Sequence, residues 1–162
     1  MDELRNNGLN PQTNLMGCGV GAYDYKENKI VVVLSSDLET GVALNVVGHL
    51  AISLGAHIEV GLMGHPTLID ASGAAHRGIS KYPLIIAKAK PNKVRAVLQS
   101  ARTDRGLFVS DYPDAMLTTA HDDDLATALS KTREEEIRYL GVLLFGHTEK
   151  VDGLTRKLSL WK

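Results

Sequence analysis

The stretch KIVVVLSSDLETGVALNVVGHLAISLGA, residues 29–56, decides the fold that we predict for this chain. Residues 29–35 form a continuous β-branched and aliphatic run, which is typical of a central strand covered on both faces of its sheet. The polar turn SDLETG follows, and residues 41–56 continue as an apolar helix that Gly55 is expected to end. A buried strand that leads directly into a helix favours a layered α/β domain.

The same alternation continues along the rest of the chain. Strands are expected at 82–89, 106–111 and 139–146, and helices at 91–103, 122–138 and 147–158. The helix at 122–138 is either continuous or two pieces broken near Ser130 and Thr132. Residues 57–82 are predicted to form a hairpin around the turn ASGA. We therefore expect a three-layer α/β/α sandwich with four strands and a hairpin insertion, in which residues 28–162 form one domain and residues 1–27 a partly mobile N-terminal extension.

Composition excludes several function classes. The formal net charge is −1, which excludes the strongly basic field of a general nucleic-acid coat protein. Cys18 is the single cysteine, so it has no partner for an internal disulfide. No apolar run reaches the length of a membrane span, and the polar N-terminus is unlike a signal peptide. We expect a cytoplasmic protein with no membrane contact.

Charge is distributed unevenly along the sequence. Residues 77–105 carry eight Lys and Arg against one Asp, whereas residues 111–136 carry eight Asp and Glu against two basic residues. Three interpretations remain open: a solvated surface, complementary patches within or between subunits, and a phosphate-binding face.

Metal and cofactor sites are not indicated. The glycine pattern GCGVGA at 17–22 lacks the preceding strand of a dinucleotide site, and the six histidines lack the spacing of a zinc-protease pair. The chain also has no cysteine cluster and no G-x-S-x-G motif. We expect neither a metal nor a cofactor.

The helix at 41–56 carries the most informative polar pair. Asn45 and His49 lie four residues apart, so they project within about 40° of each other. Small residues beside them, Gly41, Gly48 and Ala56, leave room for another group to approach. Two interpretations are open: polar side chains satisfied by a neighbouring segment in the core, or side chains that face a ligand.

Further candidates follow the ends of two strands, where open α/β sheets bind their ligands. Asp37 follows the strand at 29–35, and Asp111, Asp114 and Thr118 lie at the end of the strand at 106–111 and beyond it. If these strands run parallel and close together, the acids and His49 share one opening. The alternative for Asp111 and Asp114 is a role in turns and caps.

Three motifs resemble one known family. VDGLTRKLSLW, KIVVVLSSDLETG and GLFVSDYPDAMLTT resemble the C-terminus, first strand and third strand of the type-two peptidyl-tRNA hydrolases, with Asp37, Gly41, Asp114 and Thr118 at matching positions. LNVVGHLA, DASGAAHRGISKYP and YLGVLLFG are more similar still to an uncharacterised bacterial family grouped with these hydrolases. This resemblance implies a four-stranded mixed sheet between helices and, by analogy, a homodimer.

The departures from the hydrolase pattern are at the substrate site. Where that family has lysines and a glutamine on the first helix, this chain has Val42, Leu44 and Gly48, and Thr119 replaces a second glutamine. Apolar side chains do not supply the positive charge that an ammonium offers to phosphate or to developing negative charge. The resemblance therefore implies the scaffold without the peptidyl-tRNA hydrolase activity.

The sequence thus predicts a remodelled site with assigned roles. In a hydrolytic version His49 is the base on water, oriented by Asp37 or Asp114. Asn45 holds a carbonyl or amide of the ligand, and Asp111 and Thr118 contribute to binding. The favoured function is binding of a small ligand or a tRNA end; the alternatives are hydrolysis of a peptidyl, aminoacyl or related ester, and a purely structural dimer.

Overall fold

The computed structural model describes residues 26–58 and 61–162, so the expected N-terminal extension lies almost entirely outside the described residues, as does the glycine pattern at 17–22. The strands of the described part are β1 (Asn28–Ser35), β2 (Thr67–Ile69), β3 (Ala75–Arg77), β4 (Leu84–Ala89), β5 (Leu107–Pro113), β6 (Tyr139–His147) and β7 (Ser159–Leu160). Its helices are α1 (Thr40–His57), α2 (Pro91–Arg102), α3 (Asp122–Ser130) and α4 (Thr148–Thr155), with the 3-10 helices η1 (Asp114–Leu117) and η2 (Glu134–Glu136).

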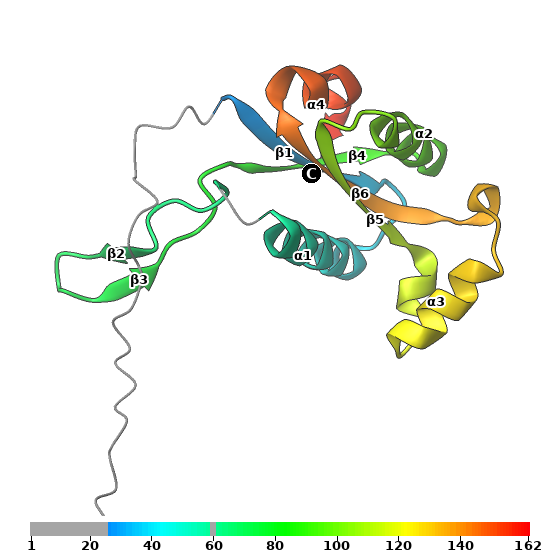
Figure 1. Ribbon diagram of the computed structural model, residues 1–162, viewed down its shortest axis with the longest axis horizontal. Helices are drawn as coiled ribbons and strands as arrows, with labels where there is room; N and C mark the ends of the chain where they lie inside the picture. The colour runs from blue at the N-terminus through cyan, green and yellow to red at the C-terminus, as the bar shows by residue number, and fades with distance from the viewer. Residues whose placement is uncertain (1–25, 59–60) are drawn as a thin grey trace, which may run out of the picture.

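One mixed sheet with the strand order β5-β6-β1-β4-β7 forms the middle layer of the molecule (Figure 1). β1 pairs with β4 in parallel and with β6 antiparallel, and β5 pairs antiparallel with β6. Figure 1 shows α1 below this sheet and α2 and α4 above it. The expected α/β/α layering is confirmed, and so is the mixed sheet.

Burial of β1 on both faces explains why its residues 30–34 are continuously apolar. Ile30, Val32 and Leu34 enter the core beneath α1. Val31 and Val33 enter the opposite core, which α2 and α4 cover. Because successive side chains of a strand point to opposite faces, the middle of a strand between two helical layers is apolar. Ser35, the buried polar residue at the end of β1, donates its hydroxyl to Asp37.

The predicted count of four sheet strands was wrong, because the sheet has five. Ser159 and Leu160, for which no strand was predicted, form β7, which pairs antiparallel with β4 at the sheet edge. The Trp161 N–H also donates to the Ile86 carbonyl at 2.9 Å. A strand of two residues is too short to show the alternation from which strands are predicted.

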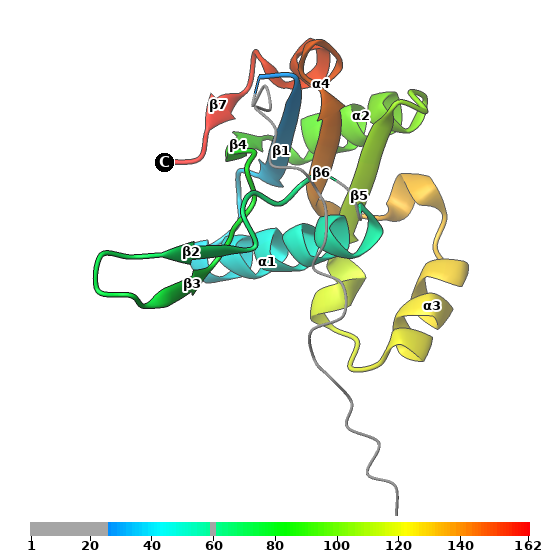
Figure 2. The ribbon, with the colours of Figure 1, turned by 60° about the vertical axis from the view of Figure 1, so that its left-hand side comes forward.

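The predicted hairpin is confirmed as β2 and β3, which form a separate two-stranded sheet. Its turn is held by Asp70, whose carboxylate accepts the backbone N–H groups of Ser72 and Ala74. Gly73 has a φ of 84°, a conformation that favours glycine. Figure 2 shows the hairpin as an arm that extends away from the five-stranded sheet.

Gly141 of β6 allows α1 to approach the sheet closely. A Cβ at this position would lie 2.7 Å from Cγ1 of Val46 and 3.0 Å from Cδ2 of Leu34. Both neighbours are buried, so neither has room to move away. In the sheet Gly141 lies between Leu34 of β1 and Tyr112 of β5.

We predict that Gly141→Ala lowers the free energy of unfolding by about 1–3 kcal/mol, because the added methyl group overpacks the contact with Val46. Gly153→Ala is the matched control, since a Cβ at Gly153 of α4 meets nothing within 4 Å. The control is expected to be neutral or to stabilise by up to about 1 kcal/mol. Urea unfolding of both variants measures the difference, and equal stabilities would contradict the close contact.

Candidate functional site

Polar and aromatic side chains line the seam between α1 and β5. The Tyr112 hydroxyl donates to Asn45 Oδ1 at 3.1 Å, and the ring of His49 meets the Tyr112 ring edge-on, with 5.6 Å between centroids. Further along the seam the Ser110 hydroxyl donates to Ser53 Oγ at 3.1 Å. Asn45 and His49 therefore share one partner, Tyr112.

Both Asn45 and His49 are exposed, so of the two interpretations the buried core pair is wrong. Tyr112 is buried, with an exposed fraction of 2 %, and burial raises the pKa of its hydroxyl. The hydroxyl therefore stays protonated and donates to the amide oxygen of Asn45. With that oxygen engaged, this exposed amide has its two N–H groups left as donors.

Asp37 lies at the carboxyl end of β1 and forms part of an ion pair. Its Oδ1 accepts the Ser35 hydroxyl at 2.5 Å, and its Oδ2 lies 3.0 Å from Nη2 of Arg138. These contacts, the Ser35 hydrogen bond first, lower the pKa of Asp37 below its ordinary value. His49 lies nine residues beyond Thr40, about 14 Å along the helix axis, so the expected orientation of His49 by Asp37 is not present.

Asp114 is the first residue of η1, the short helix that follows β5, and Thr118 is its C-cap. The backbone N–H of Asp114 donates to the Arg138 carbonyl at 2.9 Å, and the Thr118 hydroxyl donates to the Ala115 carbonyl at 3.1 Å. Asp114 and Asp37 thus lie at the same edge of the sheet, each held by Arg138. The Thr118 hydroxyl bond closes the turn at the end of η1, whereas the bond of Asp114 is made by its backbone and not by its carboxylate.

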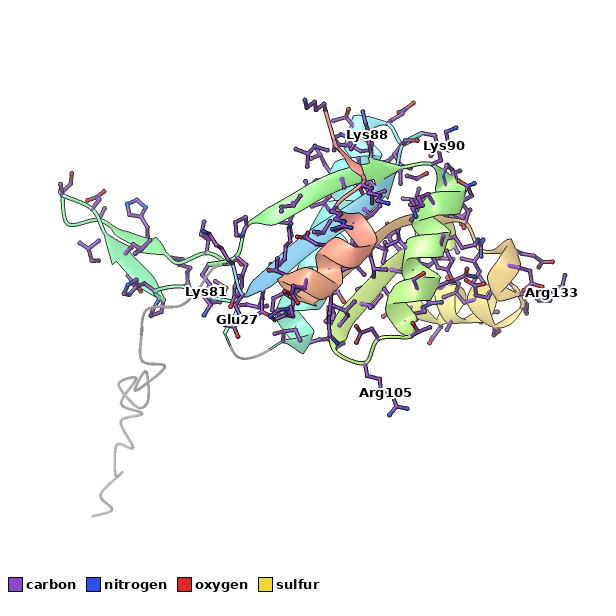
Figure 3. The ribbon with its side chains drawn as sticks, turned by 90° about the horizontal axis from the view of Figure 1, so that it is seen from above. Glu27, Lys81, Lys88, Lys90, Arg105 and Arg133 are labelled. Atoms are coloured by element: carbon purple, nitrogen blue, oxygen red, sulfur yellow. The ribbon has the colours of Figure 1, made fainter. Side chains whose placement is uncertain are left out.

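Asp111 lies on the opposite face of the sheet. Its carboxylate accepts a hydrogen bond from Nη2 of Arg102 on α2 at 2.9 Å. Arg95 of α2 also pairs with Glu134 at 3.3 Å, so basic residues of 77–105 meet acidic residues of 111–136. Among the three charge interpretations these ion pairs support complementary patches within one subunit. Figure 3 shows that Lys88 and Lys90 lie far from Arg105, so these basic residues do not form one phosphate-binding face.

The six predicted site residues therefore do not share one cavity. Asn45 and His49 meet at Tyr112, Asp37 and Asp114 meet at Arg138, and Asp111 lies across the sheet. A hollow of about 280 Å³ lies elsewhere, at the amino end of β1, where Lys26, Asn28, Lys29, Pro83, Ile85 and Thr148 line it.

Within residues 26–58 and 61–162 no group of three His, Cys, Asp or Glu side chains is placed to hold a metal ion. No described helix has the length and apolarity needed to cross a bilayer.

Sequence reasoning missed Tyr112 and Arg138. The alternation of side chains along a strand could have identified Tyr112. Neighbouring residues of a strand point to opposite faces, so Asp111 and Tyr112 cannot both face α1. Arg138 comes directly before the buried strand β6, whose antiparallel pairing with β1 places its start at the carboxyl end of β1. That pairing is not visible in the sequence alone.

We predict that Tyr112→Phe and Asn45→Ala each lower the free energy of unfolding by about 0.5–1.5 kcal/mol, because each removes the hydrogen bond between them. The double variant is expected to lose less than the sum of the two, since the bond is lost only once. A double-mutant cycle in urea checks this, with Asn92→Ala on α2 as the control. Additive losses would show that the two side chains are not coupled.

We also predict that the stabilising effect of the Asp37 carboxylate depends on pH. Because the pKa of Asp37 is lowered in the folded protein, its contribution is fully present above the pKa of the unfolded chain, about 3.9, and is lost as pH falls through the lower folded value. Asp37→Asn should therefore be less stable than the wild type at neutral pH, with the difference shrinking below about pH 4. Thermal unfolding across this range measures it; a difference that grows in acid contradicts the ion pair.

Comparisons with known proteins give a family and a fold. Residues 28–162 match the family DUF2000, which is described as a protein of unknown function. No curated protein matches the chain. Among solved structures, the protein of unknown function Atu0240 from Agrobacterium tumefaciens strain C58 is 23% identical, and the match covers 84% of this chain and 98% of that one with a TM-score of 0.73. At this identity the likeness shows an α/β fold alone, and the resemblance to peptidyl-tRNA hydrolases stays a prediction. Since the family match covers most of its length, the chain belongs to the DUF2000 family.

Proposed function

We propose that this protein is a binding module for a small, uncharged ligand that carries an amide or ester group, and that Asn45, His49 and Tyr112 form the binding surface. The hydrogen bond from the Tyr112 hydroxyl to Asn45 Oδ1 is the observation that supports this most directly. It fixes the amide so that its N–H groups face solvent, where they can donate to a ligand carbonyl. The exposed His49 ring beside it offers a nitrogen to a ligand N–H or hydroxyl.

The surroundings of this surface favour an uncharged ligand over a tRNA end. Residues 41–56 contain no Asp, Glu, Lys or Arg. α3 contacts η1, just beyond Tyr112, and its first turn carries Asp122, Asp123 and Asp124. Negative charge near the surface opposes the approach of phosphates, whereas tRNA binding depends on basic side chains. The tRNA end that the sequence left open is therefore the weaker candidate.

The contacts of Asp37 and His49 also favour binding over hydrolysis. A histidine base that activates water is normally oriented by a carboxylate. Asp37 is instead paired with Arg138, and the described contacts of His49 are with the Tyr112 ring. Among the described residues, this surface offers donors for a carbonyl, but no carboxylate pairs with His49 to generate a nucleophile.

The proposal is tested with blocked amino acids of the N-acetyl-N′-methylamide type, which carry two amide groups and no charge. We expect millimolar binding, seen by NMR as shifts of the Asn45 side-chain amide and the His49 ring. Asn45→Asp keeps an oxygen for the Tyr112 hydroxyl but removes both donors, so it should weaken binding about 3- to 10-fold with the fold intact. Asn92→Ala is the control, expected to bind as the wild type does.

Other results would overturn this proposal in distinguishable ways. Absence of shifts at Asn45 and His49, or equal binding by Asn45→Asp, excludes the surface. Salt-sensitive binding of deacylated tRNA that shifts these same signals would favour the RNA end instead. Turnover of N-acetyl-aminoacyl esters that disappears in His49→Ala would favour the hydrolase.

A further inference from the structure

β5 is the last strand of the five-stranded sheet, and no strand lies beyond it in the described part of the chain. The strand order is β5-β6-β1-β4-β7, so β5 pairs with β6 alone. Figure 2 shows β5 and β7 at opposite sides of the sheet. Residues 107–111 of β5 are half-buried, whereas residues 139–144 of β6 are buried. The outer edge of β5 is therefore open, and the strand is as long as most strands of globular proteins.

This outer edge carries backbone groups that have no hydrogen-bond partner among the described residues. In an antiparallel pair, alternate residues direct their N–H and C=O groups toward the neighbouring strand, and the residues between them direct theirs outward. Apart from its ladder with β6, the backbone of residues 108–112 makes no hydrogen bond within residues 26–58 and 61–162. The outward groups thus offer donors and acceptors at the spacing of a β-ladder.

The two edges of the sheet differ in how they are protected. The edge of β4 is covered by β7. Natural edge strands are usually kept from pairing with other chains by Lys or Pro residues, by bulges or by a covering segment. Residues 107–112 contain neither Lys nor Pro, and the charge of Asp111 is paired with Arg102. The register shift of β5 comes only at its end, between Tyr112 and Pro113. Most of this edge therefore lacks the usual protection against an added strand.

α1 runs alongside β5 and places polar side chains next to this edge. Residues on one side of α1 meet alternate residues of β5 in reverse order: Asn45 and His49 at Tyr112, Ser53 at Ser110, and His57 at Phe108. All four side chains of α1 can donate or accept hydrogen bonds. Because the sheet ends at β5, no described strand covers this side of the helix. A row of backbone groups and a row of polar side chains therefore lie along the same edge.

We propose that the ligand of this surface is an extended peptide segment of another protein, which adds to the outer edge of β5 as a further strand alongside α1. This inference rests on the proposed function, because Asn45, His49 and Tyr112 remain the side chains that recognise the ligand. In strand addition, main-chain hydrogen bonds supply affinity and alternate side chains supply specificity. Since residues 41–56 carry no charge, the side chains that face α1 are uncharged and polar, namely Ser, Thr, Asn or Gln.

Peptide titrations followed by NMR test strand addition. The probe is acetyl-Thr-Val-Thr-Val-Thr-amide, which is uncharged, favours an extended backbone and carries Thr at alternate positions. We expect it to bind at least about 10-fold more tightly than the blocked single amino acids, because it forms several ladder bonds. Methylation of the Thr nitrogens and methylation of the Val nitrogens should have unequal effects. One series loses about 10-fold or more in affinity and the other keeps most of it, because only alternate N–H groups face β5.

Two proline variants test the edge from the side of the protein. Val109 and Ser110 are neighbours in the regular part of β5, so the N–H of one faces β6 and the N–H of the other faces outward. Proline is tolerated in an edge strand where the N–H faces outward. One of Val109→Pro and Ser110→Pro should therefore keep the fold and lose about 10-fold or more in pentapeptide affinity, while the other is strongly destabilised. Asn92→Ala is the control and should bind the pentapeptide as the wild type does.

The outcomes separate this inference from the proposed function. If neither the blocked amino acids nor the pentapeptide shifts the Asn45 and His49 signals, both are wrong. If the blocked amino acids bind but the pentapeptide binds no more tightly, or both methylated series lose equally, strand addition alone is overturned. A folded proline variant that binds the pentapeptide normally overturns it as well. So does protection of the outward β5 N–H groups without peptide that rises with protein concentration, because a second copy then occupies the edge.

Discussion

The close packing of α1 on Gly141 of β6 is the contact on which the rest of the described structure depends. Val46 and Leu50 occupy the space where a side chain of β6 would otherwise lie. Tyr112 is the neighbour of Gly141 on β5, so it meets the helix at the height of Asn45 and His49. A larger residue at position 141 would raise the helix and move it away from the Tyr112 hydroxyl.

The two sides of α1 have different sequence requirements. The inner side needs volume, which Val46, Leu50 and Leu54 supply in the core. The outer side carries glycines where alanine would give a more stable isolated helix.

Electrostatics divides the molecule into two parts. On the α2 face, Arg95 and Arg102 pair with Glu134 and Asp111, and both guanidinium groups lie over the Tyr139 ring at 5.4 and 5.6 Å. On the α1 face, apart from the pair of Asp37 and Arg138 at the sheet edge, the seam is uncharged. These ion pairs of the charged segments thus lie within the subunit, and the uncharged seam is the surface that we propose for ligand binding.

The sequence by itself determined the local elements: the doubly buried strand β1, the helix α1, the hairpin and the helices on both faces follow from periodicity and turn residues. It also singled out Asn45 and His49, because their spacing of four residues within an apolar helix can be recognised from the sequence alone. Only the tertiary structure decided that Tyr112 joins them, that Arg138 holds Asp37 and Asp114, and that Asp111 turns away. Those contacts depend on strand order and on the pleat of β5, in which a shift of one residue reverses the face of every side chain. The fifth strand likewise could not be predicted from the sequence, since the two residues of β7 form a strand only through their pairing with β4.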